Sequence, residues 1–479
     1  MKPTRTLSCL LSAFALGGLA GCSTSDAELD PAPTTTQSEA GLSSAARAAT
    51  GRQLFQHALP NTNGRSCATC HVLDEDTALL PQSVEARLAR NPRDPLFNRL
   101  DADDPLAPTP TYEHLKKGLV RIILPLPANM DVIDTAGNVI TPPDRKIFVW
   151  RGVPSIADTA ITAPYLFDGR ATTLQQQAQA AIHDHSQGGD VSQRTLDRIA
   201  DFERSVFSSG RARFVSQLLD YGVPLENIPV PENFMALSPQ EQRGRDIYAA
   251  ACQACHGGAT TRQIVNRPVH DFLFSALKPD GNVVYTIVPG QGPVRVLEPR
   301  PDDEFLLVGF SYFSYLGQLG LFPTFNASVE LPRYRFRFYT DGTRQQQVTD
   351  LPPIPVTASG DPFDLVPALD ENGAPIAGPN NAPQWFSTDP GRALITGDPL
   401  DFEAFDVPPL RGVARTAPYF HDNSFATLPE VVDAYSQFLL PFVPALNLPP
   451  VHPPQFPGGP PEALSPAQKQ DLLAFLNRL

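Results

Sequence analysis

Two copies of the pattern Cys-x-x-Cys-His constrain this chain more than any other feature of its sequence. The copies are Cys67-Ala-Thr-Cys70-His71 and Cys252-Gln-Ala-Cys255-His256. In this pattern two thiols bond covalently to one haem, and the adjacent histidine binds its iron. A zinc site is the competing interpretation, but zinc asks for four ligands and each copy offers three. The sequence therefore predicts two covalently bound c-type haems, with His71 and His256 as proximal iron ligands.

The N-terminus has the pattern of an export signal. Lys2 and Arg5 form a basic start, and the apolar stretch that follows is too short for an ordinary membrane span. It ends in Leu19-Ala-Gly-Cys22, which resembles a bacterial lipobox, so Cys22 is the expected lipidation site. An ordinary signal peptide with a chance cysteine is the alternative. We expect an exported lipoprotein that faces the periplasm or cell surface and touches the membrane through its lipid alone.

The net charge narrows the class of binding partner, and the cysteine count shows whether a disulfide can form. The 479 residues carry a formal net charge of -14, which argues against nucleic acid and is compatible with a basic redox partner. Of the six cysteines, one lies in the signal, one is the proposed lipid site and four belong to the haem motifs. None remains for a disulfide, although an exported protein could form one.

The chain divides into two related halves. Each haem motif follows a similar segment, Gly51-Arg-Gln-Leu-Phe55 in one half and Gly244-Arg-Asp-Ile-Tyr248 in the other. Later, residues 153–174 match residues 407–428 at a constant offset of 254, with ten of 22 positions identical. Similarity at that level, in the same order after each motif, indicates a duplicated haem-binding unit.

The fold predicted from these patterns is mainly α-helical, with two cytochrome c-like haem domains related by internal duplication. Amphipathic helices are expected to close the halves at about residues 192–207 and from Ser465 to the end, and Ser238 begins a capping box. The second half is longer and contains alternating segments such as 282–288 and 333–340, which predict a β-containing insertion. The expected boundaries are a signal at 1–22, a flexible tether at 23–49, a first haem domain at 50–210, a linker at 211–236, and a second haem domain at 237–479 with its insertion at about 270–400.

Two further motifs resemble those of the bacterial di-haem cytochrome c peroxidase/MauG family. They are Phe167-Asp-Gly-Arg170, followed by Thr-Leu, and Thr416-Ala-Pro418-Tyr-Phe-His421-Asp, followed by Thr427-Leu. The resemblance covers both haem units and leaves out the insertion. It implies that Phe167 and Arg170 lie at the haem sites. The family has a bridging tryptophan where this chain has Phe167, so electron transfer through that tryptophan is in doubt here.

The resemblance also suggests axial ligands for the second haem. The family places a ligand, Met or Tyr, at the end of the helix that corresponds here to the segment ending at Tyr435. His421 is the alternative ligand, and a buried core tyrosine is the structural alternative for Tyr435. In the family the matching histidine lies beside a calcium ion, for which Thr416 and Pro418 would offer carbonyl oxygens.

The offset of 254 suggests a difference between the two haems. The position that matches Tyr435 in the first half is Ala181, so the first iron would keep an open coordination position, with Gln177 in its distal pocket. The glutamate that the family uses as an acid–base group is missing. His183 or His185 could shuttle protons in its place, could bind the first iron and close it, or could lie at the surface.

The function expected from these observations is peroxidase-type oxidoreductase chemistry at two haems. Hydrogen peroxide would be reduced at an open first haem, with electrons relayed through the second. The electron donor would be a small c-type cytochrome or cupredoxin, or an oxidised protein substrate. The alternatives are a non-catalytic electron-transfer cytochrome and a haem-dependent oxygenase.

Overall fold

The computed structural model describes residues 43–265, 323–352, 386–440 and 462–479, with the short pieces 285–288, 292–295, 306–308, 314 and 317–318. From Ser44 onward these residues belong to one compact unit. The expected signal at 1–22, Cys22 and most of the expected insertion lie outside the described residues. No helix in the described part is long and apolar enough to cross a membrane.

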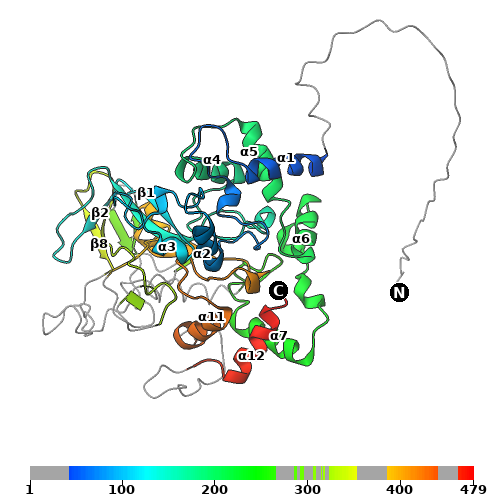
Figure 1. Cartoon of the computed structure of the whole chain (residues 1–479). Helices are drawn as coiled ribbons and strands as arrows, with labels where there is room; N and C mark the ends of the chain where they lie inside the picture. The colour runs from blue at the N-terminus through cyan, green and yellow to red at the C-terminus, as the bar shows by residue number, and fades with distance from the viewer. Residues whose placement is uncertain are drawn as a thin grey trace, which may run out of the picture. The chain divides into compact units, whose positions relative to one another are not determined.

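Each haem motif is preceded by a helix that packs against the last helix of its half. Helix α1 (Ser44–Gln56) packs on α5 (Gln193–Glu203), and α7 (Pro239–Ala251) packs on α12 (Pro466–Leu476). The α1/α5 and α7/α12 pairs lie at opposite ends of the unit, with α6 (Gly210–Asp220) between them (Figure 1). The sequence predicted a flexible tether at 23–49. Because α1 begins at Ser44, residues 44–49 are instead helical.

A glycine at each crossing explains how close the helices come. A Cβ at Gly51 would lie 1.8 Å from the carbonyl oxygen of Arg198, and a Cβ at Gly244 would lie 1.9 Å from that of Asp471. Only glycine leaves room for such a contact between two backbones. Any larger residue would push the helices apart and disturb the motif that follows each first helix.

The same kinds of side chain fill the two helical cores. Phe55 and Phe202 have ring centroids 5.0 Å apart, and Tyr248 and Phe475 have theirs 5.2 Å apart. All four rings are buried, and burial of such side chains contributes roughly 1.5–3 kcal/mol each. Buried aromatic rings therefore help to hold each helix pair together.

Helix caps agree with the sequence signals. Ser238 and Ser465 form capping boxes at the starts of α7 and α12, which confirms the expected helix start at Ser238. Thr173 and Thr427 cap α4 (Leu174–Asp184) and α11 (Leu428–Ala434), each by accepting a hydrogen bond from the backbone three residues on. A five-residue π-helix, Tyr435–Leu439, continues α11.

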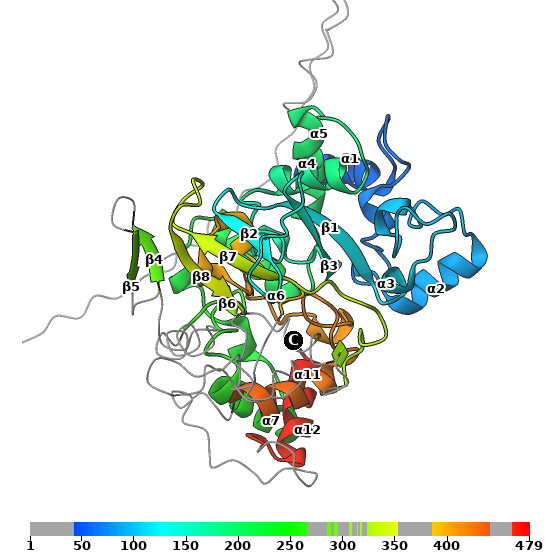
Figure 2. The same ribbon diagram turned by 90° about the vertical axis from the view of Figure 1, so that its left-hand side faces the viewer.

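The strands differ from the expectation. Strand β1 (Leu119–Pro125) pairs antiparallel with β3 (Lys146–Gly152), so the first half also contains a sheet. Strand β7 (Arg335–Tyr339) forms where the sequence predicted it, but it lies between β2 (Met130–Ile133) of the first half and β8 (Gln347–Leu351) (Figure 2). The expected β structure is therefore shared between the halves, because buried apolar residues of β2 and β7 need each other to complete one core.

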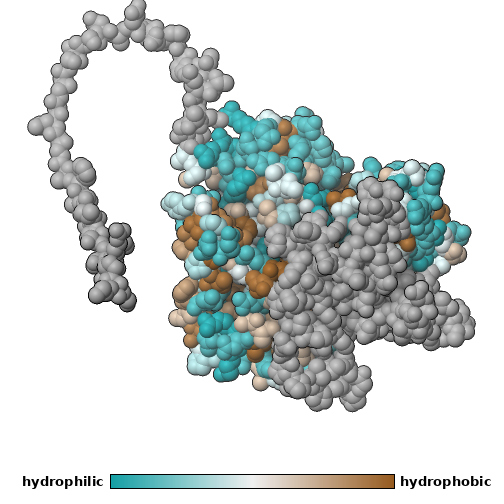
Figure 3. Space-filling model, turned by 180° about the vertical axis from the view of Figure 1, so that it is seen from behind, coloured by the Kyte–Doolittle hydropathy of each residue, from teal (hydrophilic) through white to brown (hydrophobic). Residues whose placement is uncertain are grey.

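The remaining elements are short. They comprise the helices α2 (Pro81–Arg90), α3 (Glu113–Lys116) and α10 (Ala393–Thr396), and the strand pairs β4 (Tyr285–Val288) with β5 (Gly292–Arg295) and β6 (Leu306–Val308) with β9 (Ala404–Asp406). The described fold is mainly helical with small sheets, as predicted. Figure 3 shows a largely hydrophilic surface on the described part of one face, with hydrophobic groups gathered towards one edge.

The two repeated segments adopt the same turn. Ala163-Pro164 and Ala417-Pro418 are both cis, and the tyrosine after each proline bridges to a residue six positions on, in the pairs Tyr165–Ala171 and Tyr419–Phe425. Each tyrosine hydroxyl donates a hydrogen bond of 2.9 Å to a carbonyl six residues earlier. Equal offsets in sequence thus correspond to equal local structure.

Candidate functional site

The second Cys-x-x-Cys-His motif begins where α7 ends. Cys252 is the C-cap of α7. In the next turn the backbone N–H of His256 donates a hydrogen bond of 2.9 Å to the Cys252 carbonyl. The Nδ1 atom of His256 lies 3.0 Å from the Pro408 carbonyl, to which it can only donate. Nε2 then keeps its lone pair, as an iron ligand requires. Burial lowers the pKa of His256 to about 4, so the ring is neutral at pH 7.

A cavity of about 330 Å³ lies beside this motif, and Cys252, His256 and Tyr435 line it. Apolar side chains form much of the remaining wall, including Leu428, Val432, Leu472 and Leu476. Burial raises the pKa of Tyr435, whose ring stacks on Phe420 with centroids 6.2 Å apart. The structure therefore brings the predicted proximal ligand and the predicted axial ligand to one largely apolar cavity.

His421 lines the same cavity from another side. Its ring stacks on Phe405 with centroids 3.8 Å apart, and Phe167 meets it edge-on at 6.5 Å. Its Nε2 is buried, lies 3.8 Å from Asp422 and has no hydrogen-bond partner in the described part of the chain. Burial also lowers the pKa of this ring. His421 and Phe167 thus meet where the two halves adjoin, beside the second motif.

The first motif has the same proximal geometry. The His71 nitrogen lies 2.9 Å from the Cys67 carbonyl, and His71 Nδ1 lies 3.2 Å from the Thr77 carbonyl. Burial lowers the pKa of His71 to about 4, although the carbonyls of Thr77 and Pro154 act in the other direction. Pro154 precedes Pro408 by the repeat offset of 254, so equivalent carbonyls face the two proximal histidines.

The structure separates the two distal candidates. His185 is the C-cap of α4 and lies close enough to His71 to lower its pKa. Burial lowers the pKa of His185 itself. The ring of His183 is 45% exposed, and its Nε2 lies 3.0 Å from the exposed Asp190. His185 is therefore the candidate nearer to the first motif, and His183 lies at the surface.

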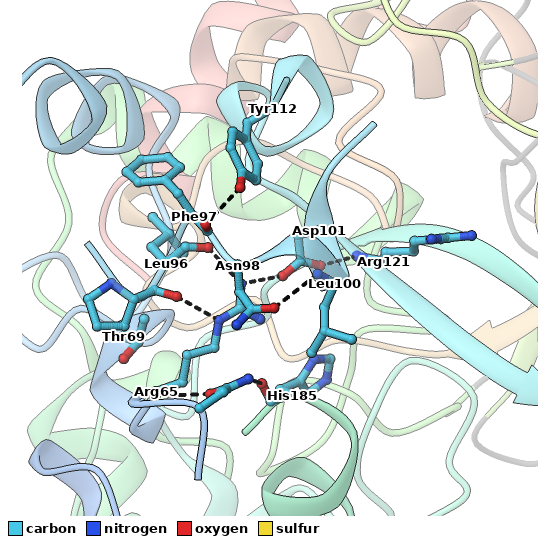
Figure 4. Close-up of polar contacts among 12 residues, drawn as sticks. Arg65, Thr69, Leu96, Phe97, Asn98, Leu100, Asp101, Tyr112, Arg121 and His185 are labelled. Carbon is cyan, nitrogen blue, oxygen red and sulfur yellow. Dashed lines mark hydrogen bonds and ion pairs between the residues drawn. The ribbon is translucent and has the colours of Figure 1, made fainter. Parts of the chain in front are cut away.

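A buried ion pair that the sequence did not reveal lies beside His185. Arg65 is 2% exposed, and its Nη2 lies 2.7 Å from Asp101 Oδ2. Its Nε and Nη2 also donate to the carbonyls of Pro95 and Leu96, at 2.9 and 2.6 Å (Figure 4). Arg65 precedes Cys67 by two residues, but a basic residue at that place carries no known signal. Thirty-six positions separate it from Asp101, so only the folded chain shows the pair.

Both sites fit a haem by the chemistry of their residues. At the first motif, Arg65 Nη1 and Gln177 Oε1 are buried without a hydrogen-bond partner in the described part of the chain. Buried polar atoms are rarely left unpaired, so polar groups of a bound molecule are the natural partners. A small cavity of about 10 Å³ lies beside Cys67 and Arg65.

A second buried ion-pair network joins the halves. Arg151, at the end of β3, donates from Nη1 to Asp168 at 2.6 Å and from Nε and Nη2 to Asp389 at 2.6 and 3.0 Å. Arg170 donates to the same Asp168 at 2.6 Å. Burial alone would raise the pKa of Asp168, but the two guanidinium groups hold it below its usual value. Ion pairs thus hold the Phe-Asp-Gly-Arg motif in place. Arg170 contributes to this through its ion pair with Asp168.

The expected calcium ligands lie in the cis-proline turn. Thr416 Oγ1 donates to the Val413 carbonyl at 3.2 Å, and the neighbouring Arg415 pairs with Asp76 at 2.9 Å. Among the described residues, no group of three or more His, Cys, Asp or Glu side chains is arranged to hold a metal ion. Calcium at Thr416 and Pro418 stays a prediction.

The family profile described as "Di-haem cytochrome c peroxidase" matches residues 45–212, which contain the first motif and the Phe-Asp-Gly-Arg turn. Residues 45–212 thus match a domain of the di-haem cytochrome c peroxidase/MauG family. The matched region contains the first Cys-x-x-Cys-His motif and the helices α1, α4 and α5.

Individual proteins resemble this chain over different lengths. "Cytochrome-c peroxidase IdrP2" of Denitromonas iodatirespirans is 46% identical over 50 residues, which is 10% of this chain and 14% of that protein. A crystal structure of a MauG-like protein associated with microbial copper homeostasis covers 90% of this chain and 88% of its own, with 19% identity and a TM-score of 0.35. The diheme peroxidase BthA of Burkholderia thailandensis covers 91% and 88%, with 15% identity and a TM-score of 0.35.

Proposed function

We propose that this chain is a di-haem peroxidase that reduces hydrogen peroxide at its first haem with electrons relayed through its second. The observation that carries the proposal is the contrast between the two sites. Tyr435 lines the cavity of the second motif, whereas the matching position of the first half is Ala181. A methyl group cannot bind iron. The first haem would therefore keep one coordination position for peroxide, while the second would have both positions filled.

The structural match between the halves supports this comparison. Tyr435 and Ala181 each lie seven residues after the first residue of their helix, Leu428 in α11 and Leu174 in α4. Both helices start at a threonine cap and follow a turn of the same geometry. These features agree with a duplicated haem unit, so we place Ala181 on the distal side of the first haem.

The residues of the first site have defined roles in the proposal. Haem iron supplies the redox chemistry that turns one peroxide, two electrons and two protons into two water molecules. His71 would bind the iron through Nε2, since its Nδ1 donates a hydrogen bond to the carbonyl of Thr77. His185, one turn beyond Ala181, would be the acid–base group that holds a proton and returns it during cleavage of the peroxide. Gln177 Oε1 is buried without a hydrogen-bond partner in the described part of the chain and would be a fixed acceptor in the distal pocket.

The second haem would receive electrons from a small c-type cytochrome, a cupredoxin or an oxidised protein substrate. His256 and Tyr435 would hold its iron, with His421 as the alternative ligand. Phe167 occupies the place of the family's bridging tryptophan and lies 6.5 Å from His421. Trp150 stacks on His114 at 4.1 Å in a separate cluster with Leu119, Val329 and Leu331. Trp150 therefore does not occupy the place of the bridging tryptophan.

The experiment that tests the proposed function is a single turnover without oxygen. The protein is reduced with dithionite, freed of excess reductant and mixed with one equivalent of hydrogen peroxide. We expect both haems to be oxidised by the one equivalent within seconds, because one peroxide takes two electrons. Haems that stay ferrous for minutes would overturn the proposal.

An electron-transfer cytochrome is the second candidate, because His185 lies close enough to His71 to affect its pKa and could serve as a second ligand of the first iron. In that case the protein would exchange electrons with a partner and would not consume peroxide. The single-turnover experiment separates the two functions. Export, lipidation at Cys22 and calcium at Thr416 and Pro418 belong to the same proposal, and mass spectrometry of the mature protein would test the lipid.

A further inference from the structure

A buried arginine lines the second haem cavity without a role in the chemistry proposed above. Arg411 lies three residues after Pro408, whose carbonyl accepts a hydrogen bond from His256 Nδ1. The Arg411 side chain is 1% exposed. The same cavity wall contains Cys252, His256 and Arg411. A cationic side chain is rarely buried unless a charged or polar group accompanies it.

Only part of the guanidinium group has protein partners. Its Nε and Nη2 donate to the two carboxylate oxygens of Glu232, both at 2.8 Å. Glu232 is itself 3% exposed and also accepts from Arg211 at 3.1 Å, so one carboxylate serves two cations. Arg411 Nη1 is buried and has no hydrogen-bond partner among the described residues.

The bidentate pair fixes the plane of the guanidinium, and this plane determines what Nη1 can bind. A donor fork held on one side by a carboxylate leaves its remaining nitrogen ready for a second anion. A molecule that fills an apolar cavity beside a Cys-x-x-Cys-His motif and also carries carboxylates is haem, through its two propionates. Pairing with one propionate would give the buried Nη1 the hydrogen-bond partner that it lacks among the described residues.

We propose that Arg411 binds a propionate of the second haem through Nη1, and that its positive charge raises the reduction potential of that haem. The inference rests on the proposed function, in that it requires a haem at the second motif. Reduction removes one positive charge from the iron, so a fixed cation nearby favours the ferrous state. Glu232 is a positioning residue, because it orients Arg411 and does not itself reach the haem.

The test is spectroelectrochemistry of variants, with two haems per chain first verified by the pyridine haemochrome assay. We expect Arg411→Gln to lower the equilibrium constant for reduction of the second haem about tenfold. For a one-electron couple this lowers the reduction potential by ~59 mV. Glu232→Gln should shift it in the opposite direction, because it removes a negative charge and leaves the cation. Arg337→Gln is the matched control, since Arg337 makes the same bidentate pair with Asp350 on β7 and β8, at 2.8 Å for both bonds.

Different failures have different meanings. A wild-type protein with only one haem per chain would contradict the proposed function itself. If the protein holds two haems and the equilibrium constant for reduction of the second haem in Arg411→Gln is within twofold of wild type, the inference is overturned and the proposed function is not. If Arg411→Gln does not fold because Glu232 is left unpaired, the double variant Arg411→Gln/Glu232→Gln decides. A lower potential in the double variant than in Glu232→Gln supports the inference, and equal potentials in these two variants overturn it.

Discussion

The phenol ring of Tyr435 stacks on the ring of Phe420, with centroids 6.2 Å apart and an interplanar angle of 30°. This contact lies in the cavity that Cys252 and His256 also line. The hydroxyl of Tyr435 is therefore carried by a ring that packs on its neighbours and not by a mobile surface side chain. Such packing suits an iron ligand, whose position must be kept when the iron changes its charge.

Replacement of Tyr435 by phenylalanine keeps the ring and removes the oxygen. We expect the second haem to lose its sixth ligand, so its ferric form should change from low-spin to high-spin in the absorption spectrum. Tyr419→Phe is the control, because Tyr419 lines the same cavity but its hydroxyl donates to the Val413 carbonyl at 2.9 Å. Identical spectra for Tyr435→Phe and wild type would rule out Tyr435 as a ligand.

Substitutions of the two histidines of α4 should have different effects. Loss of a positioned proton-transfer group typically lowers rates by ~10²–10⁴-fold, so His185→Ala should reduce kcat/KM for peroxide at least ~100-fold. His183→Ala should stay within about twofold, because the His183 ring is 45% exposed and pairs with the exposed Asp190. Steady-state oxidation of a reduced small cytochrome measures both. An increase of activity in His185→Ala would instead show that His185 closes the first iron.

Glu203 should make stability depend on pH. It is 3% exposed, its Oε2 has no hydrogen-bond partner in the described part of the chain, and burial raises its pKa from 4.5 to about 8. The folded state therefore holds a proton that the unfolded state releases above its own lower pKa. Its contribution to the free energy of unfolding is complete below about pH 4.5 and decreases by roughly 1.4 kcal/mol per pH unit as the pH rises towards 8.

Urea unfolding at pH 5, 6 and 7 checks this sign. Glu203→Gln cannot ionise, so its free energy of unfolding should decrease less over this range than that of wild type. The exposed Glu226→Gln should follow wild type. Parallel curves for Glu203→Gln and wild type would show that Glu203 is ionised in the folded protein.

The Arg151 network should matter more for stability than its surface counterparts. Arg151→Gln leaves Asp168 and Asp389 buried with fewer charged partners, and breaking a buried pair in this way costs about 3–5 kcal/mol. The side chain of Arg344 pairs with Asp131 and is 43% exposed. Arg344→Gln should therefore lower the free energy of unfolding by less than about 1 kcal/mol. Denaturant unfolding of both variants measures the difference. Equal losses would mean that the network does not join the halves energetically.

Local signals predicted the haem sites and the helices, but not how the halves combine. A Cys-x-x-Cys-His motif and a Ser238 capping box are complete within a few residues, so the sequence shows them directly. The pairing of β2 with β7 and the contact of Arg151 with Asp389 join positions about 200 residues or more apart. No local pattern specifies such a partner. Likewise, the sequence offered His183 and His185 equally, and only the folded end of α4 shows that His183 is the more exposed of the two.

The most direct test of the central claim is electron paramagnetic resonance of the diferric protein before and after one equivalent of hydrogen peroxide. An open first haem predicts a high-spin ferric signal that peroxide removes, beside a low-spin signal from the second haem. Two low-spin haems that do not respond to peroxide, in both the diferric and the half-reduced protein, would contradict the claim. The protein would then be an electron-transfer cytochrome.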